Sequence, residues 1–200
     1  MQRAEIEIMS PVGSYASLQA AIQGGAASVY FGVGKLNMRS KSSTNFTLDD
    51  LKAIVEICRR RGVRTYLTVN TVLYDEELED MRRIIDAAKK NGITAIIASD
   101  LAAIQYAHSV GMEVHVSTQV NITNLESLRF FAAYADVMVL AREMTLEHVR
   151  KITRAIQRES ITGPSGQLVQ IELFVHGALC MAISGKCYLS LHEKNHSPNR

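Results

Sequence analysis

Short apolar runs rich in β-branched residues alternate with segments of helical period along the chain, and this alternation limits the possible folds more than any other feature. The runs lie at residues 6–9, 28–32, 64–70, 94–99, 113–118, 136–141 and 170–176, and a helical pattern follows each one. Strands that alternate with helices predict a parallel sheet covered by helices. A mean repeat of about 25 to 30 residues is typical of a (β/α)₈ barrel. A doubly wound open sheet is the alternative.

Helix boundaries are well marked in the segments between these runs. Residues 14–25 end on glycines, and residues 75–92 carry acidic residues first and basic residues last. Residues 47–62 open with the capping pattern Thr47-Leu-Asp-Asp and close on Arg-Arg-Gly. Each segment is therefore predicted to be a crossover helix between two strands.

A closed barrel needs eight strands, and the sequence offers seven. A sheet that does not close leaves two unpaired edges, which are a liability in a parallel sheet. The predicted fold class is therefore α/β, a TIM-type (β/α) barrel with seven of its eight strands. We expect residues 1–200 to form a single domain, the N-terminal part of a longer protein that continues beyond Arg200. A naturally seven-stranded barrel is the alternative.

Composition narrows the classes of function. With 47% hydrophobic residues among 200, the chain can bury a sizeable core, and a net charge of +2 neither requires nor excludes an RNA partner. Glu5 and Glu7 interrupt any signal peptide, and no apolar run approaches the ~20 residues that span a bilayer. The predicted location is the cytoplasm. In a reducing compartment, three cysteines are expected to be core residues or metal ligands.

Polar residues follow the predicted strands at their carboxyl ends, where the chemistry of a (β/α) barrel takes place. They are Ser10, Gly13, Asn70, Ser99, Asp100, Ser117, Gln119, Asn121, Arg142, Glu143 and His176. Some have a purely structural alternative, since Asp100 or Asn121 can cap a following helix and Glu143 can pair with Arg142. Together they predict a polar pocket.

The glycine-containing segment FGVGKLNMRSKSSTNF carries three basic residues that suit an anionic group: Lys35, Arg39 and Lys41. It lacks the third glycine and the immediate helix of a dinucleotide site, so a glycine-enabled loop is favoured. The chain has no HExxH motif and no G-x-S-x-G elbow. Ser14 is interpreted as a helix cap.

The cysteines and histidines fall into two groups. Cys58 has helical spacing from other apolar residues and is interpreted as a core residue. His108 and His148 lie in predicted helices and His115 in a predicted strand, positions at which a lone imidazole is usually structural. The remaining set reads Cys180-x₆-Cys187-x₄-His192-x₃-His196. Zinc is an alternative there, although zinc-finger cysteines are usually two to four residues apart.

The stretch ELFVHGALCMAISGKCYLS, residues 172–190, closely resembles the signature of the collagenase-like peptidase family, number thirty-two of the unassigned-type (U) peptidases. Further matches are SPVGS, NFTLDDL, LTVNTVLYDEEL, HVSTQVNITN and VLARE, so the resemblance extends over essentially the whole chain. The family's barrel fold agrees with the strand count.

This resemblance implies a division of functions, because several family members are oxygen-independent hydroxylation proteins for transfer RNA, ribosomal RNA or ubiquinone precursors. Those members hold a [4Fe-4S] cluster on four cysteines, and the first two match Cys180 and Cys187. Two thiolates do not complete such a site, so the other ligands are expected after Arg200. The hydroxyl donor in RNA-modifying relatives is thought to be prephenate, whose carboxylates suit Arg142 or Arg39.

The resemblance leaves three readings. Iron-sulfur-dependent RNA hydroxylation, with transfer RNA uridine favoured, gives Cys180 and Cys187 as cofactor ligands and six candidate substrate contacts: Asn70, Gln119, Asn121, Arg142, Glu143 and His176. A collagenase-like peptidase would need an activated nucleophile or a metal-bound water. The third reading is a zinc-stapled RNA-binding domain without catalysis.

Overall fold

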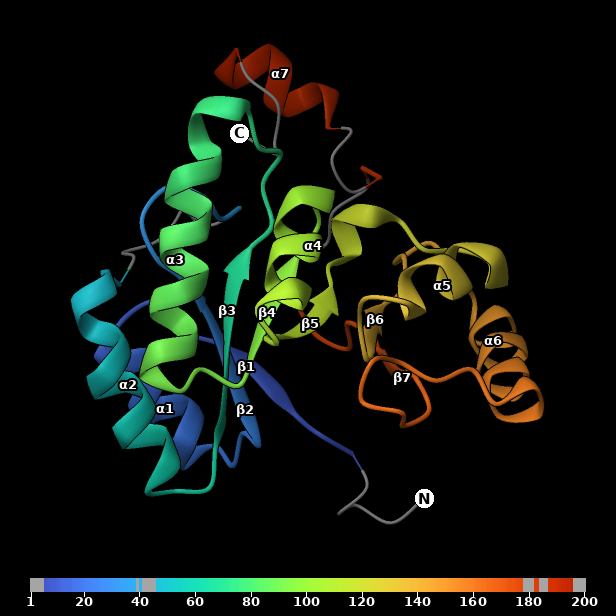
Figure 1. Ribbon diagram of the computed structural model, residues 1–200, viewed down its shortest axis with the longest axis horizontal. Helices are drawn as coiled ribbons and strands as arrows, with labels where there is room; N and C mark the ends of the chain where they lie inside the picture. The colour runs from blue at the N-terminus through green and yellow to red at the C-terminus, as the bar shows by residue number, and fades with distance from the viewer. Residues whose placement is uncertain (1–5, 39, 41–45, 178–181, 184–186, 196–200) are drawn as a thin grey trace. The chain divides into compact units, whose positions relative to one another are not determined.

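The structure is a computed structural model that describes residues 6–38, 40, 46–177, 182–183 and 187–195. Its strands are β1 (Met9–Pro11), β2 (Ser28–Gly32), β3 (Arg64–Val69), β4 (Ala95–Ala98), β5 (Glu113–Val116), β6 (Val137–Val139) and β7 (Gln170–Glu172). The α-helices are α1 (Tyr15–Gln23), α2 (Leu51–Arg59), α3 (Leu78–Asn91), α4 (Leu101–Ser109), α5 (Leu125–Ala132), α6 (Leu146–Glu159) and α7 (Tyr188–Lys194). Short 3₁₀ turns are η2 (Leu48–Asp50), η3 (Asp75–Glu77) and η4 (Thr118–Val120). Figure 1 shows this alternation of strands and helices.

In the described part of the chain, seven strands form one sheet in the order β1-β2-β3-β4-β5-β6-β7. The neighbouring pairs β1–β2, β2–β3, β5–β6 and β6–β7 are parallel. This order confirms the predicted α/β class of TIM type with seven of eight strands, and it differs from a doubly wound sheet, in which the order reverses. No helix within the described ranges is long and apolar enough to cross a membrane.

The chain divides into two compact units, one made of residues 1–69 and 73–97 and the other of residues 70–72 and 98–200. In the first unit, Tyr66 packs with Ala95 and Ile97, and Met9 and Tyr30 cover this cluster. These residues come from β1 to β4, so the cluster joins the strands of that unit.

A tyrosine and an arginine of β3 converge on one carboxylate in the first unit. The Tyr66 hydroxyl donates to Glu7 Oε1 at 2.6 Å, and Arg64 forms an ion pair with the other oxygen. The residues before β1 are thereby tied to β3.

Helix capping follows the sequence signals closely. Ser14 caps α1 and accepts a hydrogen bond from the Ser17 N–H, and Thr47 forms a capping box with Asp50. Asp100 caps α4 through the Ala102 N–H at 2.9 Å. These three polar residues are therefore satisfied locally and serve the fold.

Alternation along β5 and β6 separates two faces in the second unit. Val114, Val116 and Met138 are fully buried, and α4 packs against β5. Side chains one residue out of step point to the opposite face. His115 and Ser117 belong to that opposite face, which is where the candidate site lies.

Candidate functional site

The carboxyl-end cluster consists of Asn70, Thr71, Ser117 and Gln119, which follow strands β3 and β5 and lie in one compact unit. Asn70 Nδ2 donates to Ser117 Oγ at 3.5 Å, a long hydrogen bond. The Gln119 N–H also donates to Ser117 Oγ, at 3.4 Å. Ser117 is almost fully buried, and its hydroxyl accepts both of these hydrogen bonds.

Two polar groups of this cluster are buried without a partner. Gln119 Oε1 and Thr71 Oγ1 have no hydrogen-bond partner within the described residues. A buried amide or hydroxyl without a hydrogen bond loses about 1–3 kcal/mol relative to a satisfied one. Such groups are expected where a ligand supplies the missing bond. Gln119 Oε1 is therefore a buried acceptor open to a bond from a ligand or an ordered water.

A buried imidazole lies beside this cluster between two carboxylates. His115 is 3% exposed, with its Nε2 3.1 Å from Glu113 Oε1 and its Nδ1 3.9 Å from Glu172 Oε2. In the parallel register, His115 of β5 pairs with Val137 of β6, and Val139 of β6 pairs with Glu172 of β7. Paired residues of parallel strands share a face, so Ser117, His115 and Glu172 all project to the side of the candidate site.

The sequence prediction missed Glu172 and treated His115 as an isolated structural residue. The predicted last strand extends to His176, whereas β7 ends at Glu172. The available signal was the alternation of Gln170 and Glu172, which puts both residues on one face of the strand. Their meeting with His115 depends on strand register, which periodicity does not supply.

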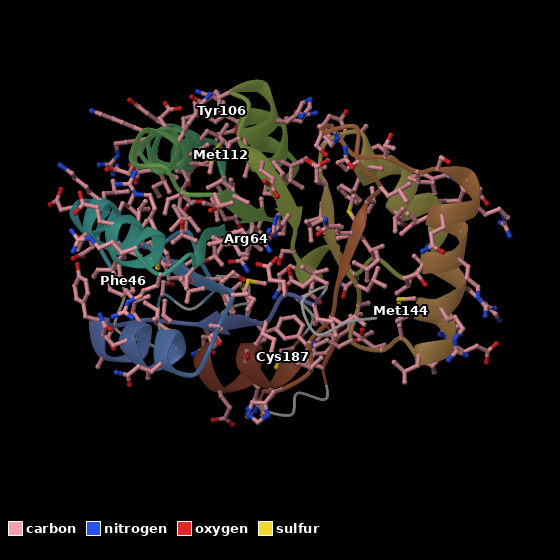
Figure 2. All side chains as sticks on the ribbon, turned by 90° about the horizontal axis from the view of Figure 1, so that it is seen from below. Phe46, Arg64, Tyr106, Met112, Met144 and Cys187 are labelled. Atoms are coloured by element: carbon pink, nitrogen blue, oxygen red, sulfur yellow. The ribbon has the colours of Figure 1, made fainter. Side chains whose placement is uncertain are left out.

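Arg142 links the end of β6 to the segment that contains the second candidate thiol. Its Nη2 donates to the Ala182 carbonyl at 3.0 Å. Cys187 follows on this segment and is half-buried immediately before α7. Hydrogen bonds from Ser190, the side-chain one first, lower the pKa of the Cys187 thiol. Figure 2 labels Cys187 at this end of the chain. Cys180 lies outside the described residues.

Three further candidates differ in their surroundings. Asn121 adopts a left-handed conformation with φ of 57° and donates from Nδ2 to the Gln119 carbonyl at 3.3 Å. It closes the η4 turn, while Asn124 caps α5 by accepting from Ser127 N, so the structural alternative of a helix cap at Asn121 does not hold. Glu143 and His176 are exposed, the first beside Arg142 and the second beyond β7.

The remaining thiol and the other charged candidates are placed as follows. Cys58 is fully buried on α2, as expected for a core residue, and burial raises the pKa of its thiol to about 11. Lys35 is exposed, whereas Arg39, Lys41 and His196 lie outside the described residues. Across the described positions, no group of three or more His, Cys, Asp or Glu side chains could hold a metal ion.

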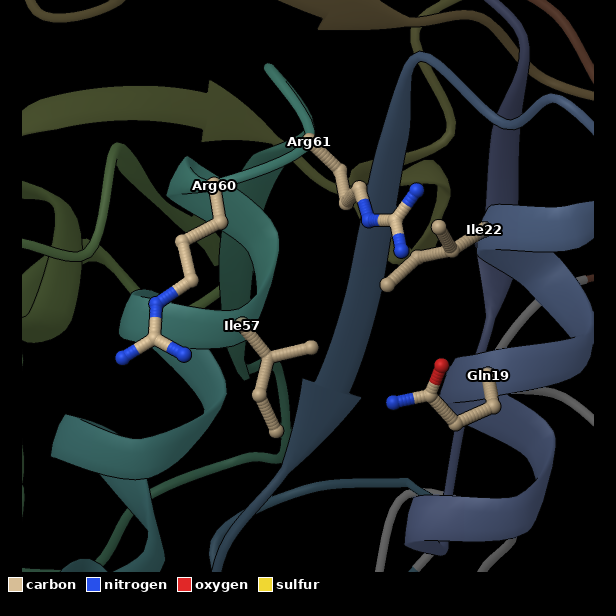
Figure 3. Close-up of a pocket in the computed structure, with 5 residues that line it drawn as sticks. All are labelled: Gln19, Ile22, Ile57, Arg60 and Arg61. Carbon is tan, nitrogen blue, oxygen red and sulfur yellow. The ribbon is translucent and has the colours of Figure 1, made fainter.

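A shallow cleft of about 180 Å³ lies between α1 and α2 in the first unit (Figure 3). Its lining consists of Gln19, Ile22, Ile57, Arg60 and Arg61. Arg60 and Arg61 precede β3, so the cleft is formed at the amino end of that strand. The carboxyl-end cluster follows the other ends of the strands, and the cleft is therefore separate from it along the chain.

Comparison with known proteins adds a family and several relatives. A family model described as Peptidase family U32 matches residues 13–200. A collagenase of Porphyromonas gingivalis is 62% identical over 196 residues, which are 98% of this chain and 47% of that protein. A 23S rRNA 5-hydroxycytidine synthase of Escherichia coli is 34% identical over 196 residues, covering 98% of this chain and 28% of that protein.

A tRNA hydroxylation protein of Bacillus subtilis is 29% identical over 197 residues, covering 97% of this chain and 44% of that protein. The chain thus spans about half, or less, of the length of these curated relatives. Among solved structures, a U32 peptidase superposes with a TM-score of 0.64 at 14% identity, covering 84% of this chain and 66% of the other. At that identity the likeness shows the fold alone.

Proposed function

Because the chain belongs to peptidase family U32, we propose that it is part of an iron-sulfur-dependent, oxygen-independent hydroxylation protein for RNA, with a transfer RNA uridine as the favoured substrate. Relatives named for rRNA and tRNA hydroxylation support this choice. The observation that carries it is the place of Cys187, a free and half-buried thiol immediately before α7 that has hydrogen bonds from Ser190. RNA substrates would place the reaction in the cytoplasm.

Cys187 has the chemistry that an iron-sulfur ligand requires. Such clusters are held by cysteine thiolates, and the thiolate is the form that the Ser190 hydrogen bonds favour. Cys180 is the second proposed ligand, and the ligands that complete a set of four would come from the longer protein. When bound, a [4Fe-4S] cluster supplies electron transfer at this site.

The carboxyl-end cluster would bind the nucleobase. Bases that are read in single-stranded RNA are recognised by hydrogen bonds to their edges. Gln119 Oε1 can accept such a bond, because it has no partner among the described residues, and Thr71 Oγ1 can accept or donate a second. Asn70 is fixed by its bond to Ser117 and presents its amide beside them.

The second partner in this proposal is a small carboxylate oxygen donor such as prephenate. Arg142 uses one guanidinium nitrogen for the Ala182 carbonyl. A guanidinium has five N–H donors in a fork that matches the two oxygens of a carboxylate. Glu143, next to Arg142, and His176, six residues before Ala182, are both exposed and remain candidate contacts.

A collagenase-like hydrolase is the second candidate, favoured by the 62% identical relative of that name. Peptide hydrolysis by a serine needs a general base in contact with its hydroxyl. Ser117 Oγ accepts from the side-chain amide of Asn70 and from the backbone N–H of Gln119, and neither donor removes a proton. The contacts of this serine therefore support binding better than nucleophilic attack.

Anaerobic purification of the full-length gene product tests the proposal. Iron and acid-labile sulfide would be measured in the wild-type protein, in Cys180→Ala and in Cys187→Ala, with Cys58→Ala as the control for the third thiol. The two site variants should lose most of the iron, while Cys58→Ala should retain it once its folding has been verified. Hydroxylated nucleosides would be measured in RNA from a deletion strain complemented with each variant.

Two results would overturn the proposal. Unchanged iron content in both site variants would remove the ligand assignment. Normal RNA hydroxylation in the deletion strain, together with loss of a peptide-cleaving activity, would favour the hydrolase.

A further inference from the structure

We infer that the cleft between α1 and α2 is a second contact site for RNA, in which Arg60 and Arg61 bind phosphates of the backbone. The inference rests on the proposed function for the identity of the ligand, whereas the site itself is defined by residues of the first unit. Contacts to phosphates position a nucleic acid without reading its sequence. The cleft would therefore add affinity for RNA to the base contacts proposed for the carboxyl-end cluster.

The lining of the cleft combines apolar and polar side chains. Ile22 and Ile57 contribute its apolar part, and Gln19, Arg60 and Arg61 contribute an amide and two guanidinium groups. Figure 3 shows the Arg61 guanidinium turned toward Ile22 of α1 and the Gln19 amide turned toward α2. The volume of about 180 Å³ is below the roughly 300–1,000 Å³ of pockets for drug-sized ligands. The cleft is therefore suited to one small group, such as a phosphate, of a larger molecule.

The guanidinium groups of Arg60 and Arg61 have the right chemistry for phosphate. A guanidinium is a planar fork that donates two parallel hydrogen bonds to two phosphate oxygens. Both arginines are exposed, and neither forms an ion pair with another residue in the described ranges. Arg64 and Arg83 of the same unit, by contrast, each pair with a carboxylate. A ligand in the cleft would therefore not have to displace a carboxylate from either arginine.

The dipole of α2 explains only part of this basic run. A helix C-terminus attracts cations, and Arg59 lies in the last turn of α2. Arg61 lies beyond the C-cap residue Arg60, and its N–H donates to the Cys58 carbonyl at 3.0 Å. Its guanidinium is turned toward α1 (Figure 3). The dipole therefore does not account for the direction of the Arg61 side chain.

The walls of the cleft carry positive charge without acidic residues. Residues 57–64 contain four arginines and no acidic residue, and residues 14–25 contain no charged residue. Glu56 is the nearest acidic residue along the chain on the α2 side. The field at the cleft is therefore positive, which attracts an anion.

The end of α3 extends this basic surface. Residues 87–94 contain Lys89 and Lys90 and no acidic residue, and α3 packs against α2. The C-cap of α3, Gly92, lies beside Val55 of α2, since a Cβ added there would be 3.8 Å from Val55 Cγ1. Cations spread over two neighbouring helix ends match the repeated charge of a nucleic-acid backbone better than the one charge of a small acid. This distribution favours RNA as the ligand.

Arg60→Ala/Arg61→Ala in the full-length protein tests the site, with Arg82→Ala/Arg83→Ala as the control of equal charge. Arg82 and Arg83 are exposed on α3 of the same unit. Binding of a fluorescein-labelled, unmodified tRNA transcript would be measured by anisotropy over a range of KCl concentrations. Loss of two phosphate contacts, at about 0.7–0.9 each, should lower the salt slope by about 1.5 and the affinity at about 0.1 M salt by about thirtyfold. The control should bind close to the wild type.

Gln19→Glu tests the other wall of the cleft without removing an arginine, and Gln105→Glu on α4 is its control. Both glutamines are exposed, so each change adds one negative charge to the surface. The carboxylate introduced on α1 would repel a phosphate in the cleft, so tRNA binding should weaken several-fold in Gln19→Glu and not in Gln105→Glu. Thermal unfolding should show an unchanged midpoint in all four variants.

The outcomes separate this site from the proposed function. Equal weakening in the two double variants, or no tRNA binding by the wild type, would overturn the site. Displacement of tRNA by polyglutamate as effectively as by unlabelled tRNA would assign the cleft to an acidic protein segment instead. Tight tRNA binding that depends on the cleft, in a full-length protein that holds no iron, would refute the iron-sulfur function and leave this site standing.

Discussion

Replacing Gln119 by Met should leave the fold as stable as before or make it more stable, although the residue lies at the candidate site. Gln119 Oε1 is buried without a partner among the described residues. A buried acceptor without a hydrogen bond lowers stability by about 1–3 kcal/mol. Methionine has nearly the same volume as glutamine and lacks this acceptor. The backbone of the turn is held independently, since the Gln119 N–H donates to Ser117 Oγ.

We therefore expect the free energy of unfolding to stay the same or to rise by about 1 kcal/mol, which corresponds to a rise in the midpoint of about 2–4 °C for a chain of this size. Urea denaturation followed by circular dichroism measures this change. Ser117→Ala is the control in the same turn, and it should lower stability by about 1 kcal/mol because it removes the capping acceptor. RNA hydroxylation should fall in Gln119→Met despite the intact fold.

Loss of 1 kcal/mol or more in Gln119→Met, with an unchanged dependence on urea, would refute this reasoning. It would mean that Oε1 is satisfied in the native protein and that Gln119 is structural. Full RNA hydroxylation by a stable Gln119→Met variant would separately remove the residue from the binding site.

Three further outcomes follow from individual contacts. Ser190→Ala should raise the pKa of Cys187 and slow its alkylation at neutral pH, measured as rate against pH, because the Ser190 side-chain hydrogen bond is the largest cause of the lowered pKa. Cys58 has its pKa raised from 9.0 to about 11, so the folded state should lose about 3 kcal/mol as pH rises through that interval. Denaturation at pH 8 to 11 should show this loss in the wild type and not in Cys58→Ala. Gly163→Ala should destabilise the fold by about 1–3 kcal/mol in urea, since the new Cβ would lie 2.4 Å from Asp136 Oδ1 and 2.8 Å from its Cα.

The strand order could be predicted from the sequence because each element carries its own signal. Periodicity of two or of 3.6 is local, and parallel strands joined by helices leave few arrangements. Strand ends were less predictable. The run of residues 170–176 looks like one strand, yet β7 ends at Glu172, and Phe174 and Val175 are exposed. An apolar run predicts burial only where something covers it, and the sequence does not say what does.

The candidate site was predictable in part for a similar reason. The rule that chemistry lies at the carboxyl ends of strands identifies Asn70 and Gln119 directly. The approach of His115 to Glu172 joins two strands that β6 separates, and the contact of Arg142 with Ala182 joins residues 40 positions apart. Both depend on register and on loop paths, which no local pattern specifies.

Hydrogen-bond satisfaction distinguishes Gln119 and Thr71 from the helix caps that also follow strand ends. Asp100 and Asn124 follow the same kind of strand end as Gln119, yet each accepts a bond from a helix N–H at 2.9 Å. Gln119 Oε1 and Thr71 Oγ1 are buried without one in the described structure. An unsatisfied buried acceptor lowers the stability of the fold, and a ligand or an ordered water that binds there would complete it. Substitution of Gln119 should therefore lower activity without lowering stability, whereas substitution of Asp100 should lower both.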